Sequence, residues 1–394
     1  MRDIVDKESL IIPDDWIEPD DIMDDANVLY DAWLAAQKNS AWKPKVQIFE
    51  MDYLCQIARL QREIRDRTYE VSKPSEFITR ERGKERLVHG GQVRDRVVEH
   101  ALNDEIIMPS ITPYLIYNNG ASQKNKGTDF TRRQLVEHLV ESYNQHGNDG
   151  YILIMDDSKF YDNIRHDILL NQFRKYIHDD TALWLVEKFV KAFEVDVSYM
   201  TDKEYAVCMD MLFNSIEYQK IDKSLLTGEK YMAKHLDIGN QTSQSAGILY
   251  PSPVDNYVKI VCGEKYYARY MDDSYVIHES REHLVELQKD ITREAAKIGI
   301  TVNQRKTHIE KLSSHWRFMQ IQYCLMDNGR IQQKINPKRV TAQRRKMKKL
   351  APKMESRQFH DEVYAWIKSN RKYMSRKQYQ NIVTLHNQLQ EVTL

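Results

Sequence analysis

The sequence predicts a fold of the α+β class, because long segments of helical periodicity flank a central region of short strands. Apolar residues recur at helical spacing in residues 27–37 and 46–68, and again in residues 354–394. In the middle of the chain, residues 151–155 are apolar without a break, which is typical of a buried strand. Two further short strands are expected within residues 266–277.

The other elements are predicted from the same periodicities and from turn residues. Gly83, Gly90 and Gly91 indicate a hairpin, and Asp327-Asn328-Gly329 indicates a turn. Residues 194–234 are less regular. Further helices are expected over residues 94–107, 131–146, 167–192, 244–261 and 281–298, a polar loop over 118–128, and short strands over 300–335.

Length and composition describe an ordinary globular chain. The 394 residues suggest two or three domains, and a hydrophobic fraction of 41% with 29% charged residues argues against disorder. The four cysteines lie far apart without a CxxC pair, so neither a disulfide framework nor a zinc site is expected. The polar start does not predict a signal peptide, and no apolar run approaches the ~18 residues of a membrane span. We therefore expect a soluble, cytoplasmic protein without a membrane partner.

The charges are balanced in number but not in position. Lys plus Arg and Asp plus Glu each number 58. Residues 1–26 are strongly acidic, with only Arg2 and Lys7 as cations, whereas residues 334–353 are basic and contain no acid. The basic segment is expected either to line a phosphate backbone or to form a solvated helix face. The acidic segment is expected to cover a partner or to fold back on a basic face.

Two places set carboxylates beside apolar strands. Asp156 follows the strand 151–155, and Asp272-Asp273 lies in the turn between the two short strands of residues 266–277. Three such oxygen donors can hold two Mg2+ ions about 3.5–4 Å apart, the arrangement that serves phosphoryl transfer. An isolated Asp-Asp pair is more often only a turn, so the assignment depends on the motifs around it.

The motifs around these carboxylates resemble those of bacterial reverse transcriptases. Tyr270-Met271-Asp272-Asp273 has the form of their YxDD signature. Six more segments resemble family motifs in the same order, and together the matches span residues of about 80–325. These are Val93–Leu102, Ala121–Thr128, Asp156–Asp162, Ile238–Gln244, Gly299–Thr307 and Phe318–Tyr323.

The resemblance implies a right-hand polymerase whose palm is a small antiparallel sheet backed by helices. It implies an acidic N-terminal extension over residues 1–45, fingers over 46–140, and a palm over 141–325. Residues of about 194–234 are expected to be an insertion in the palm, and a basic helical thumb is expected over 326–394. No nuclease, maturase or ribonuclease H pattern follows the thumb.

The resemblance also assigns roles to single residues. Asp156, Asp272 and Asp273 are expected to bind two Mg2+ ions, with Mn2+ as an alternative, although the adjacent Asp157 leaves open which carboxylate faces the metal. Tyr161 is expected to exclude a ribose 2′-hydroxyl, with a core aromatic as the alternative. Lys306 is expected to protonate the leaving pyrophosphate, with a solvated lysine as the alternative. Gly239 and Gln244 are expected to shape the nucleotide pocket, Arg94, Lys124 and Lys126 to hold the triphosphate, and Lys338, Arg339, Arg344, Arg345 and Lys348 to contact nucleic acid.

The expected activity is RNA-directed DNA synthesis from dNTPs, on a dedicated noncoding RNA, in a bacterial or phage-encoded enzyme. Expected partners are the RNA template, a DNA primer or product, and an accessory protein or a second copy of the chain. The neutral charge, acidic start and insertion favour an antiphage defence system. Ser243-Gln244 is instead similar to error-prone enzymes of diversity-generating retroelements. Untemplated or protein-primed DNA synthesis, RNA synthesis, and an inactive RNA-binding scaffold are also compatible with these motifs.

Overall fold

The computed structural model describes residues 21–81, 84–192, 194–218 and 220–391. Residues 1–20 of the predicted acidic extension, Gly83 and the last three residues of the predicted thumb lie outside the described residues. The chain forms two compact units, each discontinuous in sequence. The described residues within 1–115 and 159–250 form the first unit, and those within 116–158 and 251–394 form the second. The boundaries of fingers, palm and thumb stay predictions.

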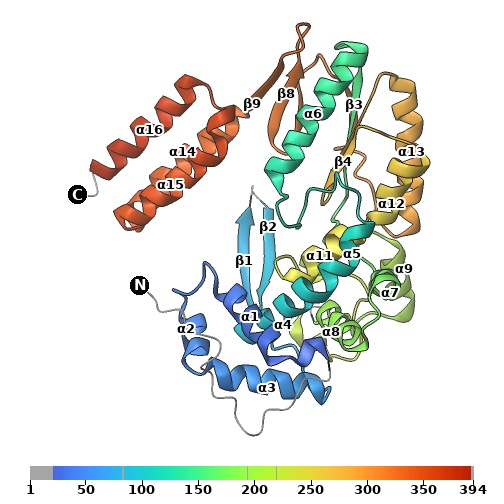
Figure 1. Cartoon of the computed structure of the whole chain (residues 1–394), viewed down its shortest axis with the longest axis vertical. Helices are drawn as coiled ribbons and strands as arrows, with labels where there is room; N and C mark the ends of the chain where they lie inside the picture. Colours follow the sequence, from blue (N-terminus) through green and yellow to red (C-terminus); the bar gives the residue numbers. More distant parts are fainter. Residues whose placement is uncertain (1–20, 82–83, 193, 219, 392–394) are drawn as a thin grey trace. The chain divides into compact units, whose positions relative to one another are not determined.

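The first unit is mainly helical. Among its described residues the one sheet is the antiparallel hairpin of β1 (Ser75–Glu81) and β2 (Lys84–Gly90). Its helices and short turns are η2 (Ile22–Asp24), α1 (Ala26–Gln37), α2 (Pro44–Met51), α3 (Tyr53–Arg65), α4 (Val93–Ala101), η3 (Leu102–Ile107), α5 (Met108–Ile111), η4 (Thr112–Tyr114), η5 (Tyr161–Asn163), α7 (His166–Tyr176), α8 (Asp180–Lys191), α9 (Asp202–Asp210), α10 (Ser215–Tyr218), η6 (Lys223–Leu225) and α11 (Gln241–Leu249). Figure 1 shows these elements in the blue to yellow part of the chain.

Two helices predicted in this unit are each divided. The segment 46–68 is α2 and α3, separated at Asp52, and the segment 167–192 is α7 and α8, separated by residues 177–179. Asp179 caps α8, because its side chain accepts from the backbone N–H of Ala182 at 2.7 Å. Because a capping side chain satisfies a backbone N–H at a helix start, Asp179 favours a new helix at this point over a continuation of α7.

Residues 194–234 form a small structure with a core of their own. Val197, Met200, Phe213 and Met232 are buried together. The backbone of Val197 donates to Lys230 at 2.8 Å, which brings the two ends of the segment side by side. A separate core is consistent with the predicted insertion.

The second unit contains two antiparallel sheets. Strands β4 (Tyr267–Tyr270), β5 (Asp273–His278), β3 (Tyr151–Asp156) and β6 (His308–Lys311) form the first sheet in that spatial order. Strands β7 (Trp316–Phe318), β8 (Ile321–Leu325) and β9 (Ile331–Ile335) form the second. The helices are α6 (Thr128–His146), α12 (Ser252–Asn256), η7 (Tyr257–Val261), α13 (Arg281–Lys297), α14 (Pro337–Leu350), η8 (Ala351–Lys353), α15 (Ser356–Asn370), η9 (Arg371–Tyr373) and α16 (Arg376–Glu391). Helices and small antiparallel sheets together confirm the predicted α+β class.

The four-stranded sheet is the rigid base of the second unit. Helices α6 and α13 pack on it, and β3 is buried along nearly its whole length. Ile152 and Ile154 of β3 share a core cluster with Leu135 and Leu139 of α6. A strand covered in this way is held firmly, so the residues at its end have fixed positions.

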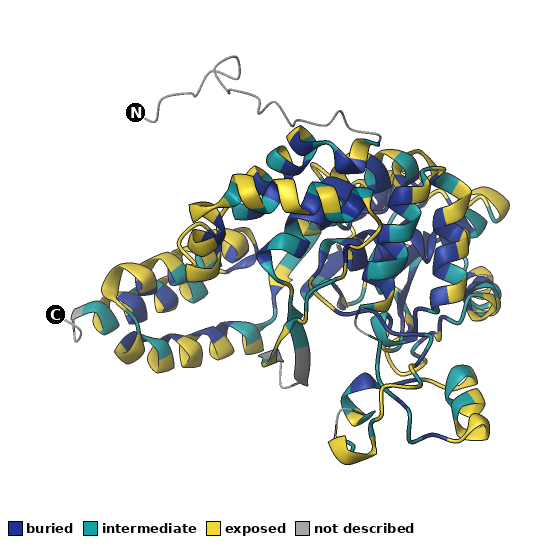
Figure 2. Ribbon diagram, turned by 90° about the horizontal axis from the view of Figure 1, so that it is seen from below, coloured by how far each residue is buried: buried dark blue, intermediate teal, exposed yellow. Residues whose placement is uncertain are grey.

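The C-terminal helices of the second unit each have one buried stripe. In α14 the buried residues are Val340, Gln343 and Met347, which recur at helical spacing. Most of the intervening cations are exposed, and Figure 2 shows exposed and buried residues alternating along the C-terminal helices. None of the described helices is long and apolar enough to cross a membrane.

The predicted helix over residues 244–261 is wrong as a single element. Helix α11 ends at Leu249, and α12 and the π-helical turn η7 follow it. Pro251 and Pro253 explain the interruption, because proline lacks the backbone N–H that a continuing helix requires. Because both prolines are visible in the sequence, the interruption of this helix could have been predicted.

Candidate active site

Two of the predicted metal ligands face each other at the end of the palm-like sheet in the second unit. Asp156 of β3 pairs directly with Asp273 of β5, the last pair in the antiparallel register. Residues that pair in this way point to the same face of the sheet, with Cβ atoms about 4.5–5.5 Å apart. Two carboxylates at this spacing repel one another, so the arrangement favours a cation beside them.

The turn between β4 and β5 places Asp272 next to this pair. Tyr270 pairs with Asp273, so Met271 and Asp272 form a two-residue hairpin turn, with Met271 at φ +52°. The backbone N–H of Asp157 donates to the carbonyl of Asp272 at 3.0 Å. The predicted turn is therefore corrected in one detail: Asp272 lies in the turn and Asp273 begins the strand.

A third segment brings a lysine and an amide to Asp156. The backbone of Asn303 donates to the carbonyl of Asp156 at 2.7 Å, and Ser158 donates to Thr301 at 2.7 Å. These bonds hold residues 301–306 beside the end of β3. Lys306 Nζ then lies 2.5 Å from Asp156 Oδ1, and Asn303 Nδ2 donates to Asp156 Oδ2 at 3.1 Å. Lys306 is half-exposed, so its ammonium also faces solvent.

Asp157 has a different environment from Asp156. Its Oδ2 accepts from Arg269 Nη1 at 2.9 Å, and Arg269 Nε donates to Asp255 Oδ1 at 2.6 Å. All three side chains are buried, and Tyr267 donates a further hydrogen bond to Asp255 at 2.6 Å. Burial raises the pKa of Asp157 to about 6, while Arg269 opposes the rise. Asp157 is therefore held in a buried ion pair, and Asp156 is the carboxylate that faces Asp273.

The donor set at the sheet end fits a magnesium site. Carboxylate oxygens are the ligands that Mg2+ prefers, and two of them stand opposite each other here. Within the described ranges, no three His, Cys, Asp or Glu side chains are already gathered around one point. Mg2+ in phosphate-transferring sites is usually held by one or two carboxylates together with substrate phosphates, rather than by a cage of protein ligands.

The predicted triphosphate clamp of residues 118–128 contains two lysines in different situations. Lys124 is exposed. Lys126 Nζ donates to the carbonyls of Tyr117 at 2.8 Å and Asn119 at 3.1 Å, and to Gln123 Oε1 at 3.0 Å. Burial lowers the pKa of Lys126. Because an ammonium has three donors, a phosphate would have to compete with these acceptors, so Lys126 chiefly holds the loop together.

Tyr161, Gly239, Gln244 and Arg94 belong to the first unit. Tyr161 is partly exposed in η5, where its ring meets Phe160 edge-on at 5.4 Å. Gly239 has φ +125°, a conformation that side-chain-bearing residues rarely adopt. Arg94 is paired with Glu63 of α3 and lies over the Tyr69 ring at 5.1 Å.

Gln244 is the one exposed residue of α11, whose other described side chains are buried or partly buried. Asn240 caps this helix by accepting from the backbone of Ser243 at 2.6 Å. The backbone of Thr242 donates to Glu99 Oε1 at 3.4 Å, which joins the start of α11 to α4. Burial raises the pKa of Glu99 to about 7. The side chain of Gln244 thus projects from a firmly held helix start.

The predicted nucleic-acid contacts lie on α14. Lys338, Arg344, Arg345 and Lys348 are exposed and Arg339 is partly exposed. Their placement away from the buried stripe fits both a solvated face and a phosphate-binding face.

Sequence reasoning missed the residues that hold the site. Arg269 of β4 and Asp255 of α12 are far from Asp157 in the sequence, and only the fold brings the three side chains together. The signal for Arg269 was present, because an arginine inside an otherwise apolar short strand is unusual unless it is paired. Asn303 carries no such signal, because an asparagine in a turn is ordinary.

Comparison with known proteins agrees with this geometry. Residues 71–351 match the family of reverse transcriptases (RNA-dependent DNA polymerases). The chain is also 20% identical over 265 residues to a yeast protein, the "Putative COX1/OXI3 intron 1 protein" of Saccharomyces cerevisiae. That alignment covers 59% of this chain and 30% of the yeast protein, so the chain spans under a third of that relative.

The fold of the molecule is that of a right-hand polymerase. Because the match covers well over half of its residues, the chain belongs to the reverse transcriptase family. Members of this family use divalent metal ions, an RNA template and nucleotides, and they make DNA.

Proposed function

We propose that this chain is an RNA-directed DNA polymerase that makes cDNA by two-metal nucleotidyl transfer on a dedicated noncoding RNA. The observation that carries the proposal is the placement of Asp156 directly opposite Asp273, with Lys306 on Asp156. Opposed carboxylates at a rigid strand end are costly for stability, and bound divalent cations would offset that cost.

In the proposed mechanism, two bound divalent ions would activate the primer 3′-hydroxyl and neutralise the leaving pyrophosphate. Asp156, Asp272 and Asp273 supply the oxygen ligands. Asn303 orients the Asp156 carboxylate through its bond to Oδ2. Lys306 holds a proton at Nζ, which can pass to the pyrophosphate oxygen as that group leaves.

Other residues would select and hold the substrate. Tyr161 excludes a ribose 2′-hydroxyl and so favours dNTPs over NTPs. Gly239 and Gln244 shape the surface under the incoming base, and Arg94 and Lys124 approach the triphosphate, with Lys126 supporting the loop. The α14 cations Lys338, Arg339, Arg344, Arg345 and Lys348 follow the phosphate backbone of the template and product.

The biological role that we propose is antiphage defence in bacteria. The zero net charge and the separate core of residues 194–234 support it. Exposed Gln244 favours a second candidate, the error-prone enzyme of a diversity-generating retroelement, because its amide can contact an incoming nucleotide.

The test is to purify the protein from its native expression context, supply Mg2+ and dNTPs, and sequence all nucleic acid that co-purifies. An Asp272→Asn variant is the control. A discrete RNA with complementary DNA in the parent alone supports the proposal, and the RNA sequence distinguishes defence from diversification. Repetitive DNA without RNA indicates untemplated synthesis, and DNA with a peptide remnant indicates protein priming. A folded protein that holds RNA but makes no DNA contradicts the proposal and indicates a scaffold, and a folded protein with neither RNA nor DNA also contradicts it.

A further inference from the structure

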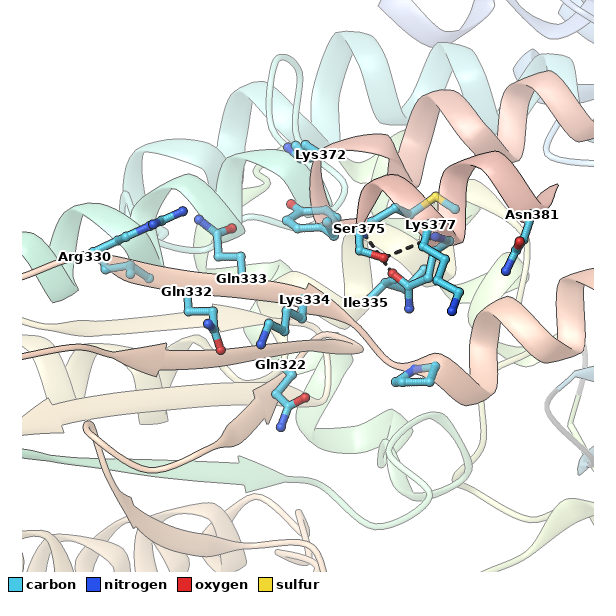
Figure 3. A pocket seen from close by; sticks show the side chains of 15 residues that line it. Gln322, Arg330, Gln332, Gln333, Lys334, Ile335, Lys372, Ser375, Lys377 and Asn381 are labelled. Carbon is cyan, nitrogen blue, oxygen red and sulfur yellow. Dashed lines mark hydrogen bonds between the residues drawn. The ribbon is translucent and has the colours of Figure 1, made fainter. Parts of the chain in front are cut away.

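A groove in the second unit is lined by cations and carboxamides. It lies between the β8–β9 sheet and the segment η9–α16, and its volume is about 650 Å3. Its lining contains four Lys or Arg side chains and five Asn or Gln side chains, but no Asp or Glu. Figure 3 shows Arg330 at one end of the groove and Lys377 and Asn381 at the other.

The cations of the groove are available to a ligand. Arg330, Lys334 and Lys377 are exposed, and within the described residues no carboxylate lies within 4.0 Å of their charged nitrogens. The fourth cation, Lys372, is partly neutralised, because its Nζ lies 3.2 Å from Asp129 Oδ1. A cluster of unpaired positive charge around a hollow attracts an anion, so the ligand carries phosphate or carboxylate groups.

The carboxamides add a second requirement. A simple phosphate or a sulfate accepts hydrogen bonds only, and cations alone would satisfy it. Gln333 and Asn381 each offer both donors and acceptors. This combination complements the Watson–Crick edges of nucleobases, which are accessible in a single strand and occupied by pairing in a duplex.

The groove also runs along the edge of a sheet. The strand order is β7-β8-β9, so β9 pairs on one side only. The alternation of the strand directs Lys334 and Gln333 to opposite faces of this edge, and Figure 3 shows them on opposite sides of the ribbon. A site that reaches around an edge in this way suits an extended chain better than a compact ligand.

From these observations we propose that the groove binds a single-stranded segment of RNA, with Arg330 and Lys377 on its phosphates and Gln333 and Asn381 on its bases. The inference rests on the proposed function in one respect, since the strand would belong to the RNA that carries the template. It adds a site that holds that RNA apart from the template–product duplex.

The first experiment measures the affinity of the full chain for a short fluorescent single-stranded RNA as salt is varied. The double variant Arg330→Gln/Lys377→Gln should bind about tenfold more weakly, and its log–log salt slope should be shallower by about 1.4, or about 0.7 per lost phosphate contact. The matched control is Lys289→Gln/Lys297→Gln, two exposed lysines of α13 that do not line the groove. Equal loss in both double variants, or in neither, overturns the proposal.

A second variant tests base contacts. Gln333→Leu/Asn381→Leu should change the order of affinity among oligo(A), oligo(C) and oligo(U) and leave the salt slope unchanged. An RNA–DNA hybrid should bind the groove variants and the parent equally. Equal weakening of hybrid and single strand would overturn the proposal by making the groove part of the duplex path. Displacement of the RNA by polyglutamate at equal charge would overturn it in favour of an acidic peptide.

The outcome is separable from that of the proposed function. If the parent fails to extend oligo(dT) on poly(rA), the proposed function fails while RNA binding in the groove can still be measured. If the parent extends that primer and the groove variants bind single-stranded RNA as the parent does, the groove inference alone fails.

Discussion

Asp156 and Asp157 are neighbours in the chain and opposites in environment. Asp156 lies on the face of the sheet shared with Asp273 and is approached by Lys306 from a half-exposed position. Asp157 is buried against Arg269, which also binds Asp255. Successive residues of a strand point to opposite faces, so one step along the backbone separates a carboxylate available for chemistry from one used for structure.

The difference teaches how a polymerase-like site can be both charged and stable. Both carboxylates are buried, but Asp156 stands opposite a second carboxylate and is paired with a half-exposed lysine, whereas Asp157 is paired with the buried Arg269. Removal of a charge should therefore have opposite consequences at the two positions, and mutations on either side can test that contrast.

The largest expected effect is on catalysis. Asp156→Asn should lower dNTP incorporation on poly(rA)/oligo(dT) by at least about a thousandfold, or about 4 kcal/mol in the transition state. Its free energy of unfolding should change by less than about 1 kcal/mol, because a repulsion with Asp273 is lost together with the Lys306 bond. Asp157→Asn should remain active within about tenfold at low temperature while it loses stability. If Asp157→Asn abolishes primer extension and Asp156→Asn lowers stability to urea, the two carboxylates have the opposite roles.

The second effect is on stability. Arg269→Met should lower the free energy of unfolding by about 3–5 kcal/mol, because Asp157 and Asp255 would remain buried without a counterion. Urea denaturation measures this. Arg293→Met is the control, since Arg293 pairs with Asp290 on the exposed side of α13 and such pairs contribute up to about 1 kcal/mol. Equal losses of stability in the two variants would mean that the buried ion pair of Arg269 contributes no more to stability than an exposed one.

The third effect separates two roles of Lys306. Lys306→Met should lower kcat by about a hundredfold, because both its charge and its proton are lost. Lys306→Arg keeps a charge that can pair with Asp156, but a guanidinium does not release its proton. If Lys306 is a general acid, the Arg variant is nearly as slow as the Met variant in single-turnover incorporation. Recovery to within a few-fold of the parent would show that charge alone matters.

The sequence predicted local features of this site well. The strand 151–155, the helix over 281–298 and the loop over 118–128 agree with the structure within about three residues at their ends, because burial and turn residues are local signals. The divided helices were less predictable, except at Pro251. The sequence indicated that Arg269 needs a partner but not that the partner is Asp157, since strand register decides which distant residues meet.

The roles within a loop also escape sequence reasoning. Lys124 and Lys126 are the same residue type in the same loop, yet Lys124 is exposed and Lys126 donates to three acceptors of that loop. Backbone carbonyls are acceptors at every position, so nothing in the sequence marks which of them a lysine will find. Only the path of the chain between Tyr117 and Phe130 determines it.

The smallest expected effect concerns a buried histidine outside the site. It tests whether burial shifts the pKa of this group, as it does that of Asp157. His138 of α6 is buried, and its Nδ1 lies 2.9 Å from the Tyr275 hydroxyl of β5. Burial lowers its pKa to about 4, and nearby Lys259 acts in the same direction. Because the unfolded chain takes up this proton near pH 6.5 and the folded chain does not, stability should fall as pH falls. The loss between pH 7 and pH 5 should be about 2 kcal/mol.

His138→Gln removes this titration and retains an atom that can accept from Tyr275. The difference in free energy of unfolding between parent and variant should therefore shift by about 2 kcal/mol toward the variant between pH 7 and pH 5, since other titrations cancel in the comparison. Urea denaturation at several pH values measures it. A constant difference would mean that His138 takes up its proton in the folded protein. Desolvation in this unit would then be weaker than the raised pKa of Asp157 requires.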